Sequence, residues 1–184
     1  MRKKRIFIAI PIQKDLKKKI VEWGRRHKNL GVEWVAAKNL HLTLIPPWYV
    51  ENIDEICDLL TQIGGNFSEF KINISRIESS PKVIWTPVEN SIELLKLKEA
   101  LERILTKKPE KRPFKPHITI AKLRQKRIFV NEKIRWKQKV DSIVLMQSHI
   151  SRKGSDYEII HQQFLEHIPR PGAQKHGHIS HQAP

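Results

Sequence analysis

Two segments of the sequence repeat a histidine and a threonine separated by one residue. The first is LHLTL, which holds His41 and Thr43, and the second is HITIA, which holds His117 and Thr119, 76 positions later. Nine histidines and five threonines in 184 residues would give about a quarter of one such match by chance. Two matches, each flanked by aliphatic residues, therefore point to shared chemistry.

The aliphatic residues around each motif predict how the motif is presented. Side chains alternate between the two faces of a β-strand, so His41 and Thr43 share one face and the leucines between them share the other. His117 and Thr119 are arranged in the same way. Two such strands facing one cleft would place two imidazoles and two hydroxyls around a common centre.

Two histidines and two hydroxyls suit the cleavage of a phosphodiester. Histidine titrates at about pH 6.5, so one copy can act as a base while another acts as an acid. In-line displacement at phosphorus needs both, and each threonine can donate to a non-bridging phosphate oxygen. Zinc sites usually use three or four ligands, and neither motif offers a second one at i+2 or i+4. The sequence thus predicts catalysis without a metal or a cofactor.

The residues HLTL and HITI resemble the two His-x-Thr-x motifs of the 2H phosphoesterase superfamily. The stretches RIFIAIPI, VEWVAAKNLHLTL, PKVIWTPV, FKPHITIAKL and SIVLMQSHISRKGSDYEII follow in the order seen in its RNA 2′,3′-cyclic phosphodiesterases, historically called 2′-5′ RNA ligases. The resemblance implies a bilobal α+β fold with one motif per lobe facing a central groove. It implies that His41 donates a proton to the departing 3′ oxygen, that His117 accepts one from water, and that Thr43 and Thr119 hold the phosphate.

Two departures from that family pattern affect the site. Lys122 stands five residues after the second histidine, where the family commonly has an arginine; it keeps the charge but loses the bidentate fork. Strict alternation places Lys122 on the face opposite His117, so it reaches the substrate only if the strand bends or ends there. After the first motif the chain reads IPPWYV where family members often have Phe-Leu-Gly, so the loop that leads out of this strand must differ. Trp48 or Tyr49 in this loop is a candidate for stacking on a base.

These residues support three hypotheses about function. The first is hydrolysis of a terminal 2′,3′-cyclic phosphate on RNA, tRNA fragments included, to a 2′-phosphate, with 2′-5′ joining as the reverse reaction. The second keeps the chemistry but acts on small cyclic or 2′-5′-linked nucleotides. The third is a module that binds RNA without turnover.

Composition favours a polyanionic partner and a protein outside the membrane. The 35 lysines and arginines exceed the 19 acidic residues and give a formal net charge of +16, which favours binding to phosphates. No apolar run approaches the roughly 18 residues needed to cross a bilayer, and the N-terminal MRKKRIFIAIPIQKD fits a strand better than a signal peptide. We expect a cytoplasmic monomer. The single cysteine, Cys57, excludes an internal disulfide and is expected to be buried.

Hydrophobic periodicity predicts an α+β chain, with residues 1–168 as one bilobal domain and 169–184 as a disordered tail. Helices are expected at about residues 13–28, 52–63 and 91–106, the last capped by Ser91. The basic segment 107–116 is expected at the mouth of the groove. Strands are expected at residues 5–12, 32–35, 40–45, 70–79, 82–88, 117–123, 139–150 and 157–165.

Overall fold

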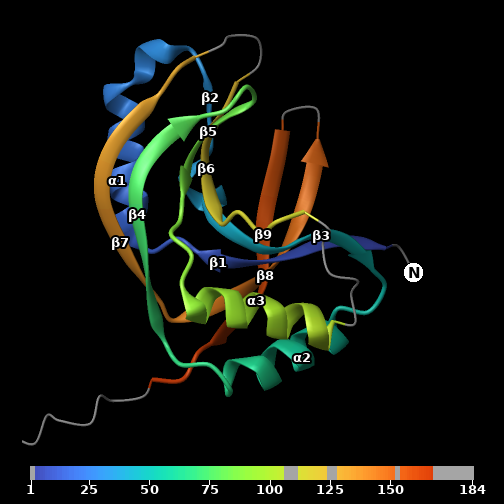
Figure 1. Ribbon diagram of the computed structural model, residues 1–184. Helices are drawn as coiled ribbons and strands as arrows, with labels where there is room; N and C mark the ends of the chain where they lie inside the picture. Colours follow the sequence, from blue (N-terminus) through green and yellow to red (C-terminus); the bar gives the residue numbers. More distant parts are fainter. Residues whose placement is uncertain (1–2, 106–111, 124–127, 152–153, 168–184) are drawn as a thin grey trace, which may run out of the picture.

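The structure, a computed structural model, describes residues 3–105, 112–123, 128–151 and 154–167. The strands of these residues form one sheet, and the helices pack on it (Figure 1). The helices are α1 (Lys14–Arg26), α2 (Asp54–Gly64) and α3 (Ile92–Ile104), with 3₁₀ turns at Lys28–Leu30 (η1) and Ala37–Asn39 (η2). The strands are β1 (Lys4–Pro11), β2 (Glu33–Trp34), β3 (His41–Val50), β4 (Phe70–Ser79), β5 (Val83–Pro87), β6 (His117–Lys122), β7 (Asn131–Val140), β8 (Ser142–Ser151) and β9 (Gly154–Phe164).

The sheet runs in the order β7-β4-β5-β6-β3-β1-β8-β9, and β2 pairs with β6. All of these named strand pairs are antiparallel. The two strands that carry the histidine–threonine motifs, β3 and β6, are neighbours at the centre of this order. In this order β7, β4, β5 and β6 form one half and β3, β1, β8 and β9 the other, so the motifs meet where the two halves of the sheet join (Figure 1).

Helix α1 packs against the β6 half of the sheet. Leu16, Ile20 and Trp23 recur at helical spacing and are buried, which is the stripe expected of an amphipathic helix. The indole of Trp23 also donates from Nε1 to Oε2 of Glu132 on β7, at 2.7 Å. Lysines and arginines cover the opposite side of α1.

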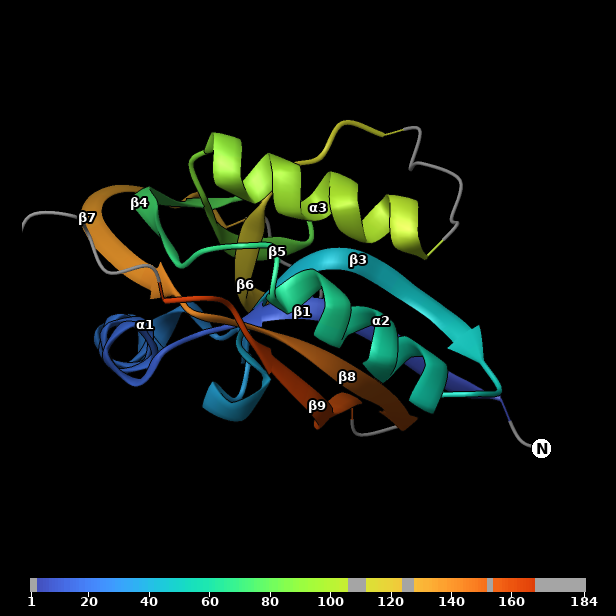
Figure 2. The same ribbon diagram turned by 90° about the horizontal axis from the view of Figure 1, so that it is seen from below.

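Helices α2 and α3 lie together and cover the other half of the sheet. Seen from below, the two helices run side by side across β3 and the β8–β9 hairpin (Figure 2). The hydroxyl of Ser91 accepts a bond from the amide of Leu94 at 3.2 Å and caps α3. The side chains of Leu94, Leu97 and Leu101 on α3 are fully buried.

The α+β class, the three predicted helices and the Ser91 cap are confirmed, but three predictions about strands are wrong. Residues 131–140 form β7, which the sequence analysis missed because charged and polar residues dominate it and only Ile134, Trp136 and Val140 are apolar. The predicted strand at 139–150 is divided at Asp141 into β7 and β8. The strand expected to end at Ile45 continues to Val50 as β3.

Strand β2 pairs with β6, and η2 lies in the link between β2 and β3. Other predictions have mixed outcomes. The thiol of Cys57 is partly exposed and not buried. No helix in the described ranges has the length and apolar character to cross a bilayer. The proposed tail at 169–184 and the basic residues 107–111 fall outside the described residues.

Candidate active site

One backbone pair between β3 and β6 brings the two motifs together. Leu42 pairs with Ile118 in antiparallel register, and both side chains are fully buried. The flanking residues point to the other face, so the register places His41 opposite Thr119 and Thr43 opposite His117. All four side chains line one cavity of about 450 Å³, here called the central groove.

Each motif strand contains a β-bulge at the same position after its threonine. In β3 the pairing with β1 shifts between Thr43 and Ile45, and in β6 the pairing with β5 shifts between Thr119 and Ala121. Two consecutive side chains are therefore buried in each strand, Leu44 with Ile45 and Ile120 with Ala121. A bulge adds a residue and reverses the alternation beyond it.

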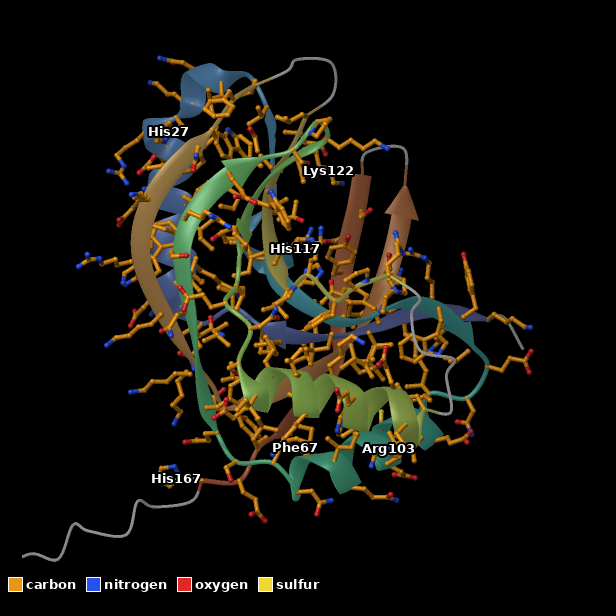
Figure 3. The ribbon with its side chains drawn as sticks, in the orientation of Figure 1. His27, Phe67, Arg103, His117, Lys122 and His167 are labelled. Carbon is orange, nitrogen blue, oxygen red and sulfur yellow. The ribbon has the colours of Figure 1, made fainter. Side chains whose placement is uncertain are left out.

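The bulge in β6 decides where Lys122 lies. Strict alternation would have turned its side chain away from His117, whereas in the structure Lys122 lines the central groove with His117 and Thr119 (Figure 3). The sequence analysis expected Lys122 to reach the site only if the strand bends or ends there, and the bulge supplies this bend. The related residue of β3 is Pro46, and neither Pro46 nor Pro47 has a ladder partner in the β1–β3 register, which is how the strand accommodates two prolines.

Both motif histidines are held through the same ring nitrogen. Nδ1 of His41 bonds to the carbonyl oxygen of Asn39 at 2.7 Å, and Nδ1 of His117 bonds to the carbonyl oxygen of Lys115 at 2.8 Å. A carbonyl only accepts, so Nδ1 carries the hydrogen in both rings. Nε2 is left in each case to take up or release a proton.

The ring of His41 lies in an enclosed, aromatic environment. Its centroid is 4.9 Å from that of Phe7 and 5.2 Å from that of Tyr157. Burial lowers the pKa of His41 below its ordinary value of 6.5, the bond to Asn39 opposes this, and the nearby His117 lowers the pKa further. His41 is therefore held mainly in the neutral form when the groove contains no anion.

Asn39 is a functional candidate that sequence reasoning missed. Its side chain is buried, with Nδ2 donating to the carbonyl of Ser155 at 3.1 Å and Oδ1 accepting from the amide of Tyr157 at 3.3 Å. Its own carbonyl holds His41. Lys38 adds an ion pair of 2.7 Å to Asp156. The residues before the first motif thereby fasten the start of β9 beside His41. An asparagine two residues before the motif gave no signal of this, because its partners are 116 and 118 positions away.

His117 occupies a more open position than His41. Its bond to Lys115 is solvent-exposed, whereas the corresponding bond of His41 is partly buried. Its ring meets that of Trp85 edge to face, with centroids 4.9 Å apart. Glu33, the backbone partner of Lys122 in the antiparallel β2–β6 pair, also lines the central groove.

Other residues considered from the sequence lie elsewhere. His27 stacks on Trp23, and His167 contacts Glu69; both are far from His117 (Figure 3). Tyr49 is 63% exposed, and it lines a separate hollow with Trp48 beside α2 and α3. The stacking role considered for Trp48 or Tyr49 has no support from this position. Within the described ranges, no three His, Cys, Asp or Glu side chains gather where they could hold a metal ion.

Comparison with known proteins shows to which family the chain belongs. Residues 14–152 match the family model described as the 2′-5′ RNA ligase superfamily. The chain belongs to this superfamily. It is 32% identical over 131 residues to a Thermotoga maritima protein named RNA 2′,3′-cyclic phosphodiesterase, covering 65% of this chain and 70% of the relative. A Methanocaldococcus jannaschii protein of the same name is 26% identical over 177 residues, covering 85% and 98%.

Solved structures confirm the fold. TT0787 of Thermus thermophilus superposes with a TM-score of 0.75 at 21% identity, over 89% of this chain and 98% of that one. LigT of E. coli in its apo form gives 0.74 at 22% identity, over 90% and 99%. These structures confirm the expected fold, and the family model confirms the expected family.

Proposed function

We propose that this protein hydrolyses the 2′,3′-cyclic phosphate at the end of an RNA chain to a 2′-phosphate. One observation carries the proposal: two histidines, each with Nδ1 held by a backbone carbonyl, line the same groove as two threonines. The names of the Thermotoga and Methanocaldococcus relatives support this substrate.

In the proposed reaction, the cyclic phosphate lies among the four motif side chains. His117 accepts a proton at Nε2 from a water molecule as that water attacks phosphorus. The bond from phosphorus to the 3′ oxygen breaks on the opposite side, and Nε2 of His41 donates a proton to that oxygen. The phosphate stays on the 2′ oxygen, and the two histidines exchange their protonation states.

The other groove residues stabilise charge on the phosphate. Thr43 and Thr119 donate hydroxyl hydrogens to its non-bridging oxygens, where negative charge grows in the transition state. Lys122 supplies a positive charge from the same face of β6. The phosphate also prepares His41 for its role, because an anion beside the ring raises the pKa that burial has lowered.

The surroundings of the two histidines support this division of roles. The proton donor must sit beside the ribose, and His41 lies within the more enclosed part of the groove, next to Phe7 and Tyr157. The base must meet water, and His117 is at the open side.

The positive net charge of +16 favours RNA over a small cyclic nucleotide as the substrate. A module that only binds RNA would not need two matched titrating groups.

The test is incubation of the purified protein with an oligoribonucleotide that ends in a 2′,3′-cyclic phosphate, with and without EDTA. We expect hydrolysis under both conditions and a product whose phosphate is on the 2′ oxygen, determined by phosphorus NMR. An untouched substrate, a 3′-phosphate product or a complete loss of turnover in EDTA would contradict the proposal. Cyclic mononucleotides assayed in parallel test the alternative substrate class.

A further inference from the structure

One face of the strands β4 and β7 carries a strip of cationic side chains. Strand β7 is at the edge of the sheet, and β4 is its neighbour. Exposed residues alternate with covered ones along β7, so its exposed side chains share one face. Lys71 on β4 pairs with Lys139, and Arg76 pairs with Lys133, so the cations of β4 lie on that same face. We call the following exposed residues the basic strip: Lys71, Arg76, Lys133, Arg135, Lys137 and Lys139.

The basic strip lies on the same face of the sheet as the motif side chains. Glu78 on β4 pairs with Trp85 on β5, and Trp85 pairs with Thr119 on β6. Residues directly opposite each other share a face, so the face that bears Thr119 continues to Glu78 and to Arg76, two residues earlier. Helix α1 packs on the other face, behind β7 (Figure 1). With about 4.8 Å between strands and 3.3 Å per residue, Arg76 is roughly 12 Å from Thr119.

Protection of the sheet edge does not account for the basic strip. Lysines on an edge strand hinder its pairing with another sheet, which would explain the cations of β7. Strand β4 has a partner on each side and needs no such protection. Like charges directly opposite each other destabilise a strand pair, yet Lys71 faces Lys139 and Arg76 faces Lys133. A role outside the folding of the sheet is therefore required.

The cations of the strip outnumber the carboxylates beside them. Lys139 forms an ion pair of 2.8 Å with Glu69, and Arg76 forms one of 3.0 Å with Glu78. Within the described ranges, the other four cations have no carboxylate at ion-pair distance: Lys71, Lys133, Arg135 and Lys137. A surface with this surplus of positive charge favours a polyanionic partner.

The strip offers contacts to a nucleic-acid backbone. The exposed residues of β4 and β7 are all charged or polar, and Asn73 and Ser75 lie between the cations of β4. Such side chains bind phosphate and sugar oxygens. Surfaces that bind single strands instead stack bases on aromatic side chains, whereas double-stranded RNA is recognised through its phosphates and 2′-hydroxyls. The composition of the strip matches the second case.

We infer that the basic strip binds the double-stranded stem of an RNA whose cyclic-phosphate end lies in the central groove. This inference rests on the proposed function and names its substrate class, a stem followed by a short single-stranded 3′ overhang. The overhang spans the distance of roughly 12 Å between Arg76 and Thr119. From Lys133 to Lys139 the strip extends about 20 Å, and a duplex presents one negative charge about every 1.7 Å of its axis. Several phosphates of the stem therefore meet cations of the strip at once.

The test compares two double variants that make the same change of charge on opposite faces of the sheet. Lys133→Glu/Lys137→Glu alters the basic strip, and Lys18→Glu/Lys19→Glu alters exposed residues of α1 outside the central groove. Fluorescence anisotropy measures their affinity for an RNA hairpin with a short 3′ overhang and for an unpaired strand of the same length. Hydrolysis is measured with a cyclic-phosphate form of the hairpin and with a cyclic-phosphate dinucleotide, which is too short to reach the strip.

We expect the strip variant to bind the hairpin at least fivefold more weakly than the α1 variant. Its slope of log affinity against log salt concentration should be smaller by about two, one for each lost phosphate contact. The ratio of kcat/KM for the hairpin to kcat/KM for the dinucleotide should fall at least fivefold in the strip variant and stay within about twofold in the α1 variant. This ratio is insensitive to a general loss of folded protein.

Equal affinities of the two variants for the hairpin would overturn the inference. Equal losses for the hairpin and the unpaired strand would also overturn it, because the strip would then not recognise a stem. An unchanged ratio of kcat/KM would show that the strip does not guide the substrate. If wild type hydrolyses no cyclic end at all, the proposed function fails, while hairpin binding still decides whether the strip holds a stem.

Discussion

Leu42 and Ile118 form the backbone pair around which the whole site is arranged. Their side chains are fully buried beneath the sheet, and their neighbours in sequence face the central groove. Each histidine therefore lies beside the threonine of the other motif. One end of the site is formed by His41 and Thr119, and the other by His117 and Thr43. This crossed arrangement means that neither motif forms a complete end of the site by itself.

Replacing either histidine with glutamine should remove most of the activity. General acid or base catalysis by a positioned group contributes about 10²- to 10⁴-fold, so we expect kcat to fall in that range for His41→Gln and for His117→Gln. The double variant should lose little more than either single one, since the two groups act in one step.

His149→Gln is the matched control for these substitutions, because His149 is exposed on β8 and pairs with Glu158. Its kcat should stay within about twofold of wild type, as expected for a residue that takes no part in the proton transfers. A His41→Gln protein that retains more than a tenth of the wild-type kcat would contradict the proposed role of His41.

Binding of a phosphate monoester should be coupled to protonation of His41. Burial lowers its pKa, so the ring is mainly neutral at pH 7 in the free protein, and an anion in the groove should raise the pKa and draw a proton from solution. Calorimetry of nucleoside 2′-phosphate binding in buffers of different ionisation enthalpy measures this uptake. Wild type should take up protons near pH 7, and His41→Gln should take up fewer; equal uptake would exclude His41 as the group responsible.

The same shift predicts how the stability of the free protein depends on pH. The pKa of His41 is lower in the folded protein than in the unfolded chain, so acidification through about pH 6.5 protonates the unfolded chain first. The free energy of unfolding should therefore fall with decreasing pH over this interval, and less steeply in His41→Gln. Urea denaturation at several pH values measures the two slopes.

The sequence predicted the chemistry of the site better than its geometry. His41, Thr43, His117 and Thr119 could be found because a repeated pattern of alternating residues is local. The position of Lys122 could only be stated as a condition, because a bulge depends on how β6 pairs with β5 and leaves no mark in composition. Asn39 was missed for a related reason, since its hydrogen-bond partners are far away in the sequence.

Strand β7 illustrates the same limit in the fold. Its sequence NEKIRWKQKV is dominated by charged and polar residues, and only Gln138 and Val140 are buried. It is a strand because β4 pairs with it along almost its entire length. Helix α1, by contrast, could be predicted from the sequence, because its apolar residues recur at helical spacing within one continuous segment.

Asn39 should act on catalysis by positioning His41 and the start of β9. Asn39→Ala removes the acceptor for the Tyr157 amide and the donor to Ser155. We expect the free energy of unfolding to fall by about 1 to 3 kcal/mol and kcat to fall about tenfold, with a smaller change in KM. Asn39→Asp keeps the acceptor and should recover part of both losses. A purely structural residue would lower stability without shifting the His41 titration followed by NMR, and such a result would refute the positioning role.

Lys122 should contribute to binding of the phosphate through its charge. A hydrogen bond to a charged group is worth about 1.5 to 3 kcal/mol, so Lys122→Ala should raise KM or weaken 2′-phosphate binding by roughly tenfold or more at low salt. Lys122→Arg keeps the charge and offers two parallel donors to a phosphate, so it should bind as tightly as wild type or more tightly.

Lys82→Ala is a suitable control, because Lys82 is an exposed lysine on the turn before β5 and lies outside the lining of the central groove. The decisive comparison is the salt dependence of binding: Lys122→Ala should flatten it and Lys82→Ala should leave it nearly unchanged. Equal affinities and salt slopes for the two alanine variants would show that the β6 bulge places Lys122 in the groove without a role in holding the phosphate.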